Sequence, residues 1–170
     1  MGIDFAIIVY THTDMEDVWP IFFGQFEKYL GNSKVYVALN KKSNKIPHNH
    51  PQIIYDDSFP YTDRWKEILS KINEEIFMFI HEDMILFDLP KLQLLNKYYK
   101  LVKEHKIESV KMIYVPSQSG PIGDITSNID NTLITNEFSQ LSIQPTIISK
   151  KSFISILNSV NSLNIWDFEA

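Results

Sequence analysis

An unbroken run of five bulky apolar residues, Ile76-Phe-Met-Phe-Ile80, constrains the fold of this chain more than any other stretch. No polar residue alternates within the run, which is typical of a strand buried on both faces in the middle of a parallel sheet. The residues His81, Glu82 and Asp83 follow where this strand should end. In open α/β sheets, ligands bind beyond the carboxyl ends of the strands, so this triplet is a candidate binding site.

Glu82 and Asp83 place two adjacent carboxylates beside the apolar residues of the run. Such a pair is costly to remove from water unless a positive charge lies next to it. A hard divalent cation, which takes oxygen ligands and can hold phosphate oxygens on its other side, would relieve that cost. The alternative is that the pair marks a solvated turn, and these residues alone favour the two interpretations about equally.

The first half of the chain has the element order of a parallel α/β unit. Apolar and β-branched residues predict strands over residues 3–10, 34–39, 52–55 and 76–80. Apolar residues at helical spacing predict helices over residues 17–30, from residue 61 and from residue 88. In the third of these helices we expect Asp88 to be the cap and Pro90 to lie in the first turn.

The second half predicts a smaller, antiparallel part. A strand is expected over residues 109–115, and a loop rich in Ser, Gly, Pro, Asp and Asn over residues 116–130. Two further strands, over residues 132–138 and 141–148, precede a last helix that begins at Ser149. We therefore expect one α/β domain over residues 1–170, with a mostly parallel central sheet and helices on both of its faces.

Composition restricts the partners and the compartment. The net charge of −5, without a concentrated basic stripe, argues against a nucleic-acid partner. The lysines fall in a loop and along one expected helix, where a solvated face is the simpler explanation. No apolar run is long enough for a transmembrane segment, and the N-terminus shows no signal peptide. With no cysteine in the chain, we expect a soluble cytoplasmic domain.

Taken in order, these features resemble nucleotide-sugar glycosyltransferases of the GT-A fold, of the small kind found in bacterial and large-virus genomes. The triplet at 81–83 is similar to the metal-binding Asp-x-Asp of that family, or to variants such as Glu-Asp-Asp. The first strand runs into Tyr10, Thr11 and His12, where such enzymes meet the nucleobase. The helix that begins Tyr61-Thr-Asp-Arg-Trp65, the strand at 141–148 and the segment Ile165-Trp-Asp-Phe-Glu169 complete the likeness.

The resemblance implies a Rossmann-like GT-A domain that uses Mn²⁺ or Mg²⁺, with Asp83 as the metal ligand. Glu82 would ligate directly, bind through water or hydrogen-bond the donor sugar. For an inverting enzyme, a carboxylate takes the proton of the acceptor hydroxyl, and the resemblance assigns this role to Glu169 or Asp167. Such enzymes usually continue past this point, so we expect a C-terminally trimmed chain or an acceptor side completed by another part.

The remaining contacts to the sugar donor are expected from residues that could instead have a purely structural role. Tyr10, Thr11 and His12 would contact the base, although Thr11 also suits a cap. Arg64 would contact the base or phosphates with its guanidinium fork, or would pair with Asp56, Asp57 or Asp63. Asp56, with Asp57, would hydrogen-bond uracil or ribose, or would hold a turn.

The function expected from this resemblance is sugar transfer from a UDP- or GDP-sugar to a hydroxyl of a glycan or other acceptor, in the cytoplasm of the cell, or of the host if the chain is viral. The first alternative is a nucleotidyltransferase, which a glycine-rich phosphate loop after the first strand would favour. The segment from Tyr10 to Asp14 contains no glycine. The second alternative is a nucleotide-sugar-binding domain without turnover.

Overall fold

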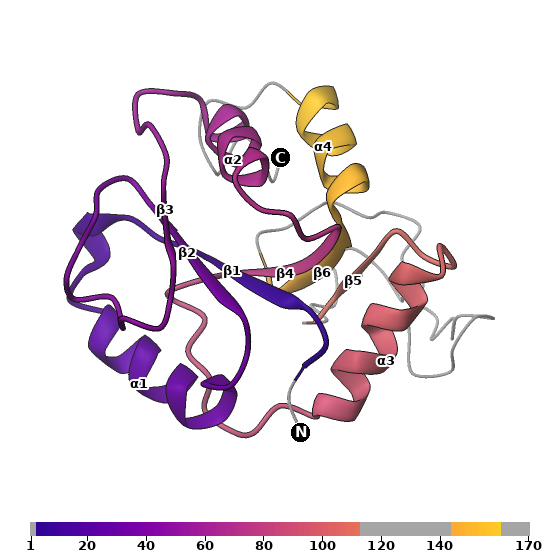
Figure 1. The fold of residues 1–170 in the computed structure, drawn as a ribbon, viewed down its shortest axis with the longest axis horizontal. Helices are drawn as coiled ribbons and strands as arrows, with labels where there is room; N and C mark the ends of the chain where they lie inside the picture. Colours follow the sequence, from indigo (N-terminus) through magenta and orange to yellow (C-terminus); the bar gives the residue numbers. More distant parts are fainter. Residues whose placement is uncertain (1–2, 113–143, 161–170) are drawn as a thin grey trace, which may run out of the picture.

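The structure is a computed structural model that describes residues 3–112 and 144–160. Its strands form one six-stranded sheet in the order β3-β2-β1-β4-β6-β5 (Figure 1). The strands are β1 (Ala6–Tyr10), β2 (Val35–Leu39), β3 (Gln52–Ile54), β4 (Ile76–His81), β5 (Ser109–Lys111) and β6 (Thr146–Ser149). The apolar run at 76–80 therefore lies inside the sheet, between β1 and β6.

The sheet is mostly parallel, as the sequence predicts. β1 pairs in parallel with both β2 and β4, and β2 pairs in parallel with β3. β6 runs antiparallel to its two neighbours, β4 and β5. Of the strands expected to be antiparallel, the one expected over residues 141–148 is confirmed as antiparallel: it forms β6.

Helices cover both faces of this sheet. α1 (Trp19–Leu30) and α3 (Leu92–Lys103) pack on one face, and α2 (Tyr61–Ser70) and α4 (Lys150–Ser159) pack on the other (Figure 1). Alternate residues of β4 belong to the two cores, with Met78 and Ile80 facing α1 and Phe77 and Phe79 facing α2. Because both faces of β4 are covered, the strand needs an apolar residue at every position.

The boundaries of several elements differ from those that the sequence predicts; β6, for example, begins at Thr146 and not at residue 141, and the starts of β1 and α3 have a local reason. β1 begins at Ala6 and not at residue 3, because the amide of Asp4 donates to the side chain of Asn96 in α3 at 2.9 Å. α3 begins at Leu92, so Asp88 and Pro90 lie before it. The carboxylate of Asp88 accepts from the neighbouring amide of Leu89 at 2.7 Å, which explains why it does not cap the helix.

The last helix begins as expected, because Ser149 accepts the amide of Ser152 and caps α4. The expected loop at 116–130 and the expected strand at 132–138 lie outside the described residues. None of the helices in the described part of the chain is long and apolar enough to cross a membrane.

Candidate functional site

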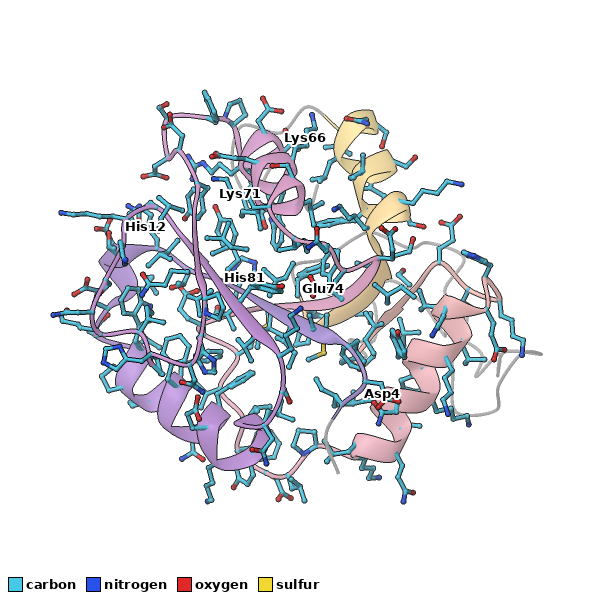
Figure 2. The ribbon with its side chains drawn as sticks, in the orientation of Figure 1. Asp4, His12, Lys66, Lys71, Glu74 and His81 are labelled. Atoms are coloured by element: carbon cyan, nitrogen blue, oxygen red, sulfur yellow. The ribbon has the colours of Figure 1, made fainter. Side chains whose placement is uncertain are left out.

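The carboxyl ends of β1 and β4 lie side by side at the centre of the sheet. From β1 the chain passes to β2 and β3 on one side, whereas β4 lies on the other side. Tyr10, the last residue of β1, is paired with His81, the last residue of β4. Figure 2 labels His81 and His12 near these ends, with Glu74 near the start of β4. This is the switch point at which open α/β sheets bind ligands.

Glu82 and Asp83 occupy the turn that leaves β4, closed by a hydrogen bond from the amide of Met84 to the carbonyl of His81 at 3.1 Å. Glu82 is buried and Asp83 is exposed. The Oε2 atom of Glu82 is inaccessible to solvent and has no hydrogen-bond partner in the described part of the chain. Burial raises the pKa of Glu82, the charge of Asp83 raises it further, and a hydrogen bond with Thr11 lowers it in part.

These two carboxylates fit a hard divalent cation that also has ligands from a bound substrate. Residues 3–112 and 144–160 contain no group of three or more His, Asp or Glu side chains that could hold a metal by themselves. Mg²⁺ is usually held by one or two carboxylates together with substrate phosphates and water. The exposed carboxylate of Asp83 and the unpartnered oxygen of Glu82 match that kind of donor set.

Thr11 connects four elements directly below this turn. Its side chain accepts a hydrogen bond from the indole of Trp19 at 2.8 Å, and its carbonyl accepts one from the hydroxyl of Tyr55 at 2.9 Å. Its hydroxyl also hydrogen-bonds Glu82. Thr11 is almost fully buried, and its hydroxyl lies next to the Glu82 carboxylate.

His12 and Arg64 are joined through Asp57. His12 Nδ1 accepts the amide of Asp14 at 3.1 Å, so the ring proton is on Nε2, which donates to Asp57 Oδ2 at 2.9 Å. Arg64 Nη1 lies 2.8 Å from Asp57 Oδ1. The same guanidinium donates to the backbone carbonyls of Asp57 and Phe59 at 2.6 and 2.7 Å. His12, and not Thr11, is therefore the residue that caps the turn after β1.

The structure separates the two neighbouring aspartates that follow β3. Asp56 Oδ1 accepts from both the amide and the hydroxyl of Ser58, which holds a local turn and lowers the pKa of Asp56. Asp57 is the one that contacts His12 and Arg64. Of the partners that the sequence offers Arg64, the structure pairs it with Asp57, while Asp56 holds the turn.

Tyr10 belongs to an aromatic cluster beneath the site. Its ring stacks on Tyr55 with centroids 5.1 Å apart and on Trp65 with centroids 5.2 Å apart. The ring of His81 lies 5.2 Å away on the neighbouring strand. Burial raises the pKa of the Tyr10 hydroxyl, while hydrogen bonds with Tyr55 and Arg64 lower it in part. Tyr10 and Trp65 are both buried in the core at this end of β1.

His81 predicts a loss of stability in acid. Burial lowers its pKa to about 4, from an ordinary value of 6.5. Between these values the unfolded chain binds a proton that the folded protein rejects, so stability falls as the pH falls. We expect His81 to remove about 3 kcal/mol of the free energy of unfolding between pH 7 and pH 4. Urea denaturation in metal-free buffer at both pH values measures it.

The control for this prediction is His81→Phe, which removes the titrating ring. Glu82, whose raised pKa favours the folded state in acid, contributes to both proteins and cancels in the difference between them. Equal loss of stability in the wild type and in His81→Phe would contradict the assignment.

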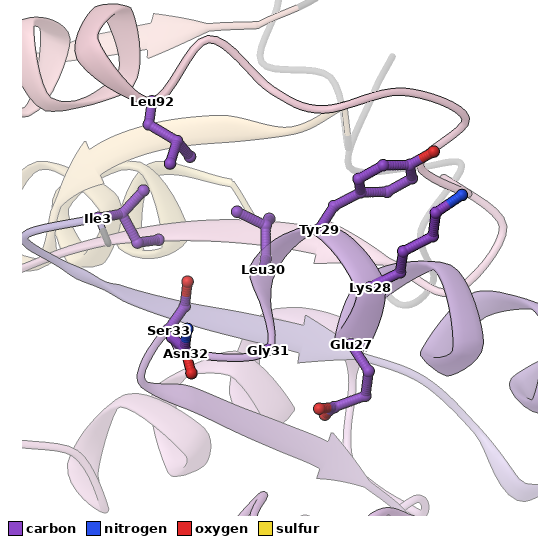
Figure 3. Close-up of a pocket in the computed structure, with 9 residues that line it drawn as sticks. All are labelled: Ile3, Glu27, Lys28, Tyr29, Leu30, Gly31, Asn32, Ser33 and Leu92. Carbon is purple, nitrogen blue, oxygen red and sulfur yellow. The ribbon is translucent and has the colours of Figure 1, made fainter. Parts of the chain in front are cut away.

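The two candidate catalytic carboxylates, Glu169 and Asp167, lie outside the described residues. One depression of about 220 Å³ lies at the end of α1, where it is lined by Glu27, Tyr29 and Leu92, among others (Figure 3). α1 runs back from the carboxyl ends of the strands, so its C-terminal end lies at the opposite edge of the sheet. None of the residues that line this depression is a candidate site residue.

No protein-family model matches the chain, and no curated protein sequence matches it. Among solved structures, a cytidylyltransferase from Leptospira borgpetersenii superposes with a TM-score of 0.59 at 9% identity, over 99% of this chain and 68% of that chain. The bifunctional IspDF from Campylobacter jejuni gives a TM-score of 0.53 at 15% identity, over 95% of this chain and 44% of its own. Residues 1–349 of S. aureus TarS superpose with a TM-score of 0.50 at 15% identity, over 94% of this chain and 49% of that chain.

At such low identities the likeness shows the fold alone. The chain has a mixed α/β, Rossmann-like arrangement with a mostly parallel six-stranded sheet. It spans less than half the length of the IspDF and TarS chains.

Proposed function

We propose that this chain is a metal-dependent glycosyltransferase, which transfers a sugar with inversion from a UDP- or GDP-sugar to a hydroxyl of a glycan or other acceptor. One observation carries the proposal. The Glu82–Asp83 turn after β4 is linked to Thr11 at the end of β1, and His12 and Arg64 are joined beside it through Asp57. A ligand at the switch point would therefore meet carboxylates and polar side chains together.

Asp83, assisted by Glu82, would hold Mn²⁺ or Mg²⁺ in this proposal. The cation would supply positive charge against the diphosphate that departs from the sugar. Arg64 does not offer that charge freely, because its guanidinium already donates to the carbonyls of Asp57 and Phe59 and pairs with the Asp57 carboxylate. Arg64 is better suited to hold the segment after β3 in place than to bind phosphates.

The segment after β1 favours a glycosyltransferase over a nucleotidyltransferase. A triphosphate needs free backbone amides or basic side chains around it. Here the amides of Thr13, Asp14 and Met15 donate to Asn40, to His12 Nδ1 and to the His12 carbonyl. The sequence has no lysine or arginine before Lys28, while Asp14, Glu16 and Asp17 make the segment acidic. The segment would therefore repel a triphosphate.

The acceptor side of the proposal depends on residues near the C-terminus. Glu169, or else Asp167, would take the proton of the acceptor hydroxyl as the oxygen attacks the anomeric carbon. Glu169→Gln would then lower turnover and leave binding of the nucleoside diphosphate unchanged, because the base contacts the acceptor and not the donor.

The test is calorimetric titration with UDP, GDP and CTP, with and without Mn²⁺. We expect one nucleoside diphosphate to bind only with Mn²⁺, and CTP to bind more weakly. An assay for hydrolysis of the matching nucleotide sugar then separates an enzyme from a binding domain. The free sugar that is released is the measured product. Tight binding of CTP, together with release of pyrophosphate from CTP when a sugar phosphate is added, would replace the proposal by nucleotidyl transfer.

A further inference from the structure

The connection from β4 to α3 exposes large apolar side chains close together. Phe87 is 92% exposed and Leu89 is 59% exposed, and Ile85 is exposed as well. We refer to residues 85–89 as the apolar tip. Burying such side chains in an apolar phase is strongly favourable, so their exposure marks a candidate interaction surface.

The apolar tip is held at one place on the protein surface. The hydroxyl of Tyr29, at the end of α1, donates to the carbonyl of Phe87 at 3.3 Å. Lys28 lies over the ring of the same tyrosine, 4.7 Å from its centroid. Figure 3 shows Lys28 and Tyr29 next to each other at this end of α1. On the other side of the tip, the exposed residue Lys91 leads directly into α3.

The segment that follows the tip carries a local excess of positive charge. Residues 91–111 contain six lysines and two glutamates, while the rest of the chain contains ten basic and nineteen acidic residues. Lys97, Lys100 and Lys103 lie on the exposed side of α3, whose other side packs on the sheet through Tyr98 and Val102. The protein is therefore electrically asymmetric despite its negative net charge.

We propose that the apolar tip and the exposed lysines of α3 form a docking surface for an anionic membrane. Exposed apolar side chains that enter the boundary between headgroups and acyl chains, together with lysines on an amphipathic helix, are the features by which peripheral proteins bind anionic lipid. The choice of an anionic membrane rests on the charge complementarity that the α3 lysines supply and on the 92% exposure of Phe87, which makes its ring accessible for insertion. The tip follows Glu82 and Asp83 in the same connection, but the proposal does not depend on the proposed transferase activity.

Co-sedimentation with vesicles tests this surface. We expect the wild-type chain to bind vesicles of phosphatidylcholine mixed with phosphatidylglycerol, to bind phosphatidylcholine alone weakly, and to lose binding as salt is raised. The double variant Phe87→Ser with Leu89→Ser should lose at least about tenfold in partitioning, because two apolar insertions are removed. Lys91→Gln with Lys100→Gln should lose roughly fivefold for each lysine.

Two matched controls carry the same kinds of change elsewhere. Ile21→Ser alters an exposed apolar residue near the start of α1, and Lys41→Gln with Lys42→Gln removes two exposed lysines after β2. Both should partition like the wild type, and all variants should keep the wild-type melting temperature. Nucleotide titration of the same variants should be unchanged, so a failure here is distinguishable from failure of the transferase proposal.

Three results would overturn the proposal. The first is equal binding of the wild type and of the Phe87 and Leu89 double variant, or no binding to either vesicle. The second is a concentration-dependent dimer that this double variant abolishes, which would assign the surface to a second copy of the chain. The third is binding to duplex DNA as tight as to the anionic vesicles, which would assign the lysines to a nucleic acid.

Discussion

Asp83→Ala is expected to abolish the Mn²⁺-dependent binding of a nucleoside diphosphate. The variant removes the exposed carboxylate of the pair and leaves Glu82, which is buried and whose pKa is raised. The variant removes one of the two negative charges that attract the cation and leaves Glu82 as the only carboxylate of the pair. Since Arg64 is already engaged by Asp57 and Phe59, we expect no side chain of the described site to take over the neutralisation of the phosphates.

Titration calorimetry with and without Mn²⁺ measures this loss, and thermal unfolding without metal provides the stability control. Asp83 is exposed, so its removal should leave the free energy of unfolding within about 0.5 kcal/mol of the wild type. Asp88→Ala is the matched variant, because it removes another exposed carboxylate from the same connection between β4 and α3. If Asp83→Ala bound the nucleotide as tightly as Asp88→Ala, the metal site as we propose it would be wrong.

Trp65→Ala is expected to destabilise the fold by about 3–5 kcal/mol. Trp65 is fully buried on α2, where its ring contacts Tyr10, Phe79 and Phe153. The cavity would open directly beneath the end of β1, so nucleotide binding should weaken together with stability. Because domains of this size are stable by only about 5–15 kcal/mol, the variant would lose a large share of the total. Urea denaturation followed by far-ultraviolet circular dichroism measures the change.

Trp65→Phe separates the volume of the ring from its polar N–H. The indole Nε1 is buried and has no hydrogen-bond partner within the described ranges, so phenylalanine removes an unsatisfied donor as well as some volume. We expect this variant to cost less than about 1.5 kcal/mol. A cost equal to that of Trp65→Ala would mean that the indole N–H has a partner, and would contradict this interpretation.

The arrangement of the sheet was predictable wherever burial dictates the residue type. β4 is covered on both faces, so every position from Ile76 to Ile80 is apolar and the strand is evident in the sequence. The start of α3 was not predictable, because Asp88 has the chemistry of a cap and only the folded chain shows that it bonds to Leu89. Local preferences could not decide between these two uses of one carboxylate.

The site was predictable at the level of strand ends and not at the level of individual side chains. The 81–83 triplet and Thr11 each follow a buried strand in the sequence. Their position therefore predicted that they lie at the edge of the sheet where the parallel strands end. The contrast between buried Glu82 and exposed Asp83, and between Asp56 and Asp57, depends on the path of single turns. Adjacent residues with the same chemistry give the sequence no means of ranking them.

The hydrogen bonds of the segment after β1 bear on how a ligand would be received. Since the amides of Thr13, Asp14 and Met15 already have acceptors within the protein, this segment is held by internal hydrogen bonds without a ligand. Little conformational freedom remains there to be lost, so association with a nucleotide would carry a small ordering penalty on this side. The pre-organised segment would then act as a fixed template, and any adjustment to differently shaped donors would have to come from elsewhere in the protein.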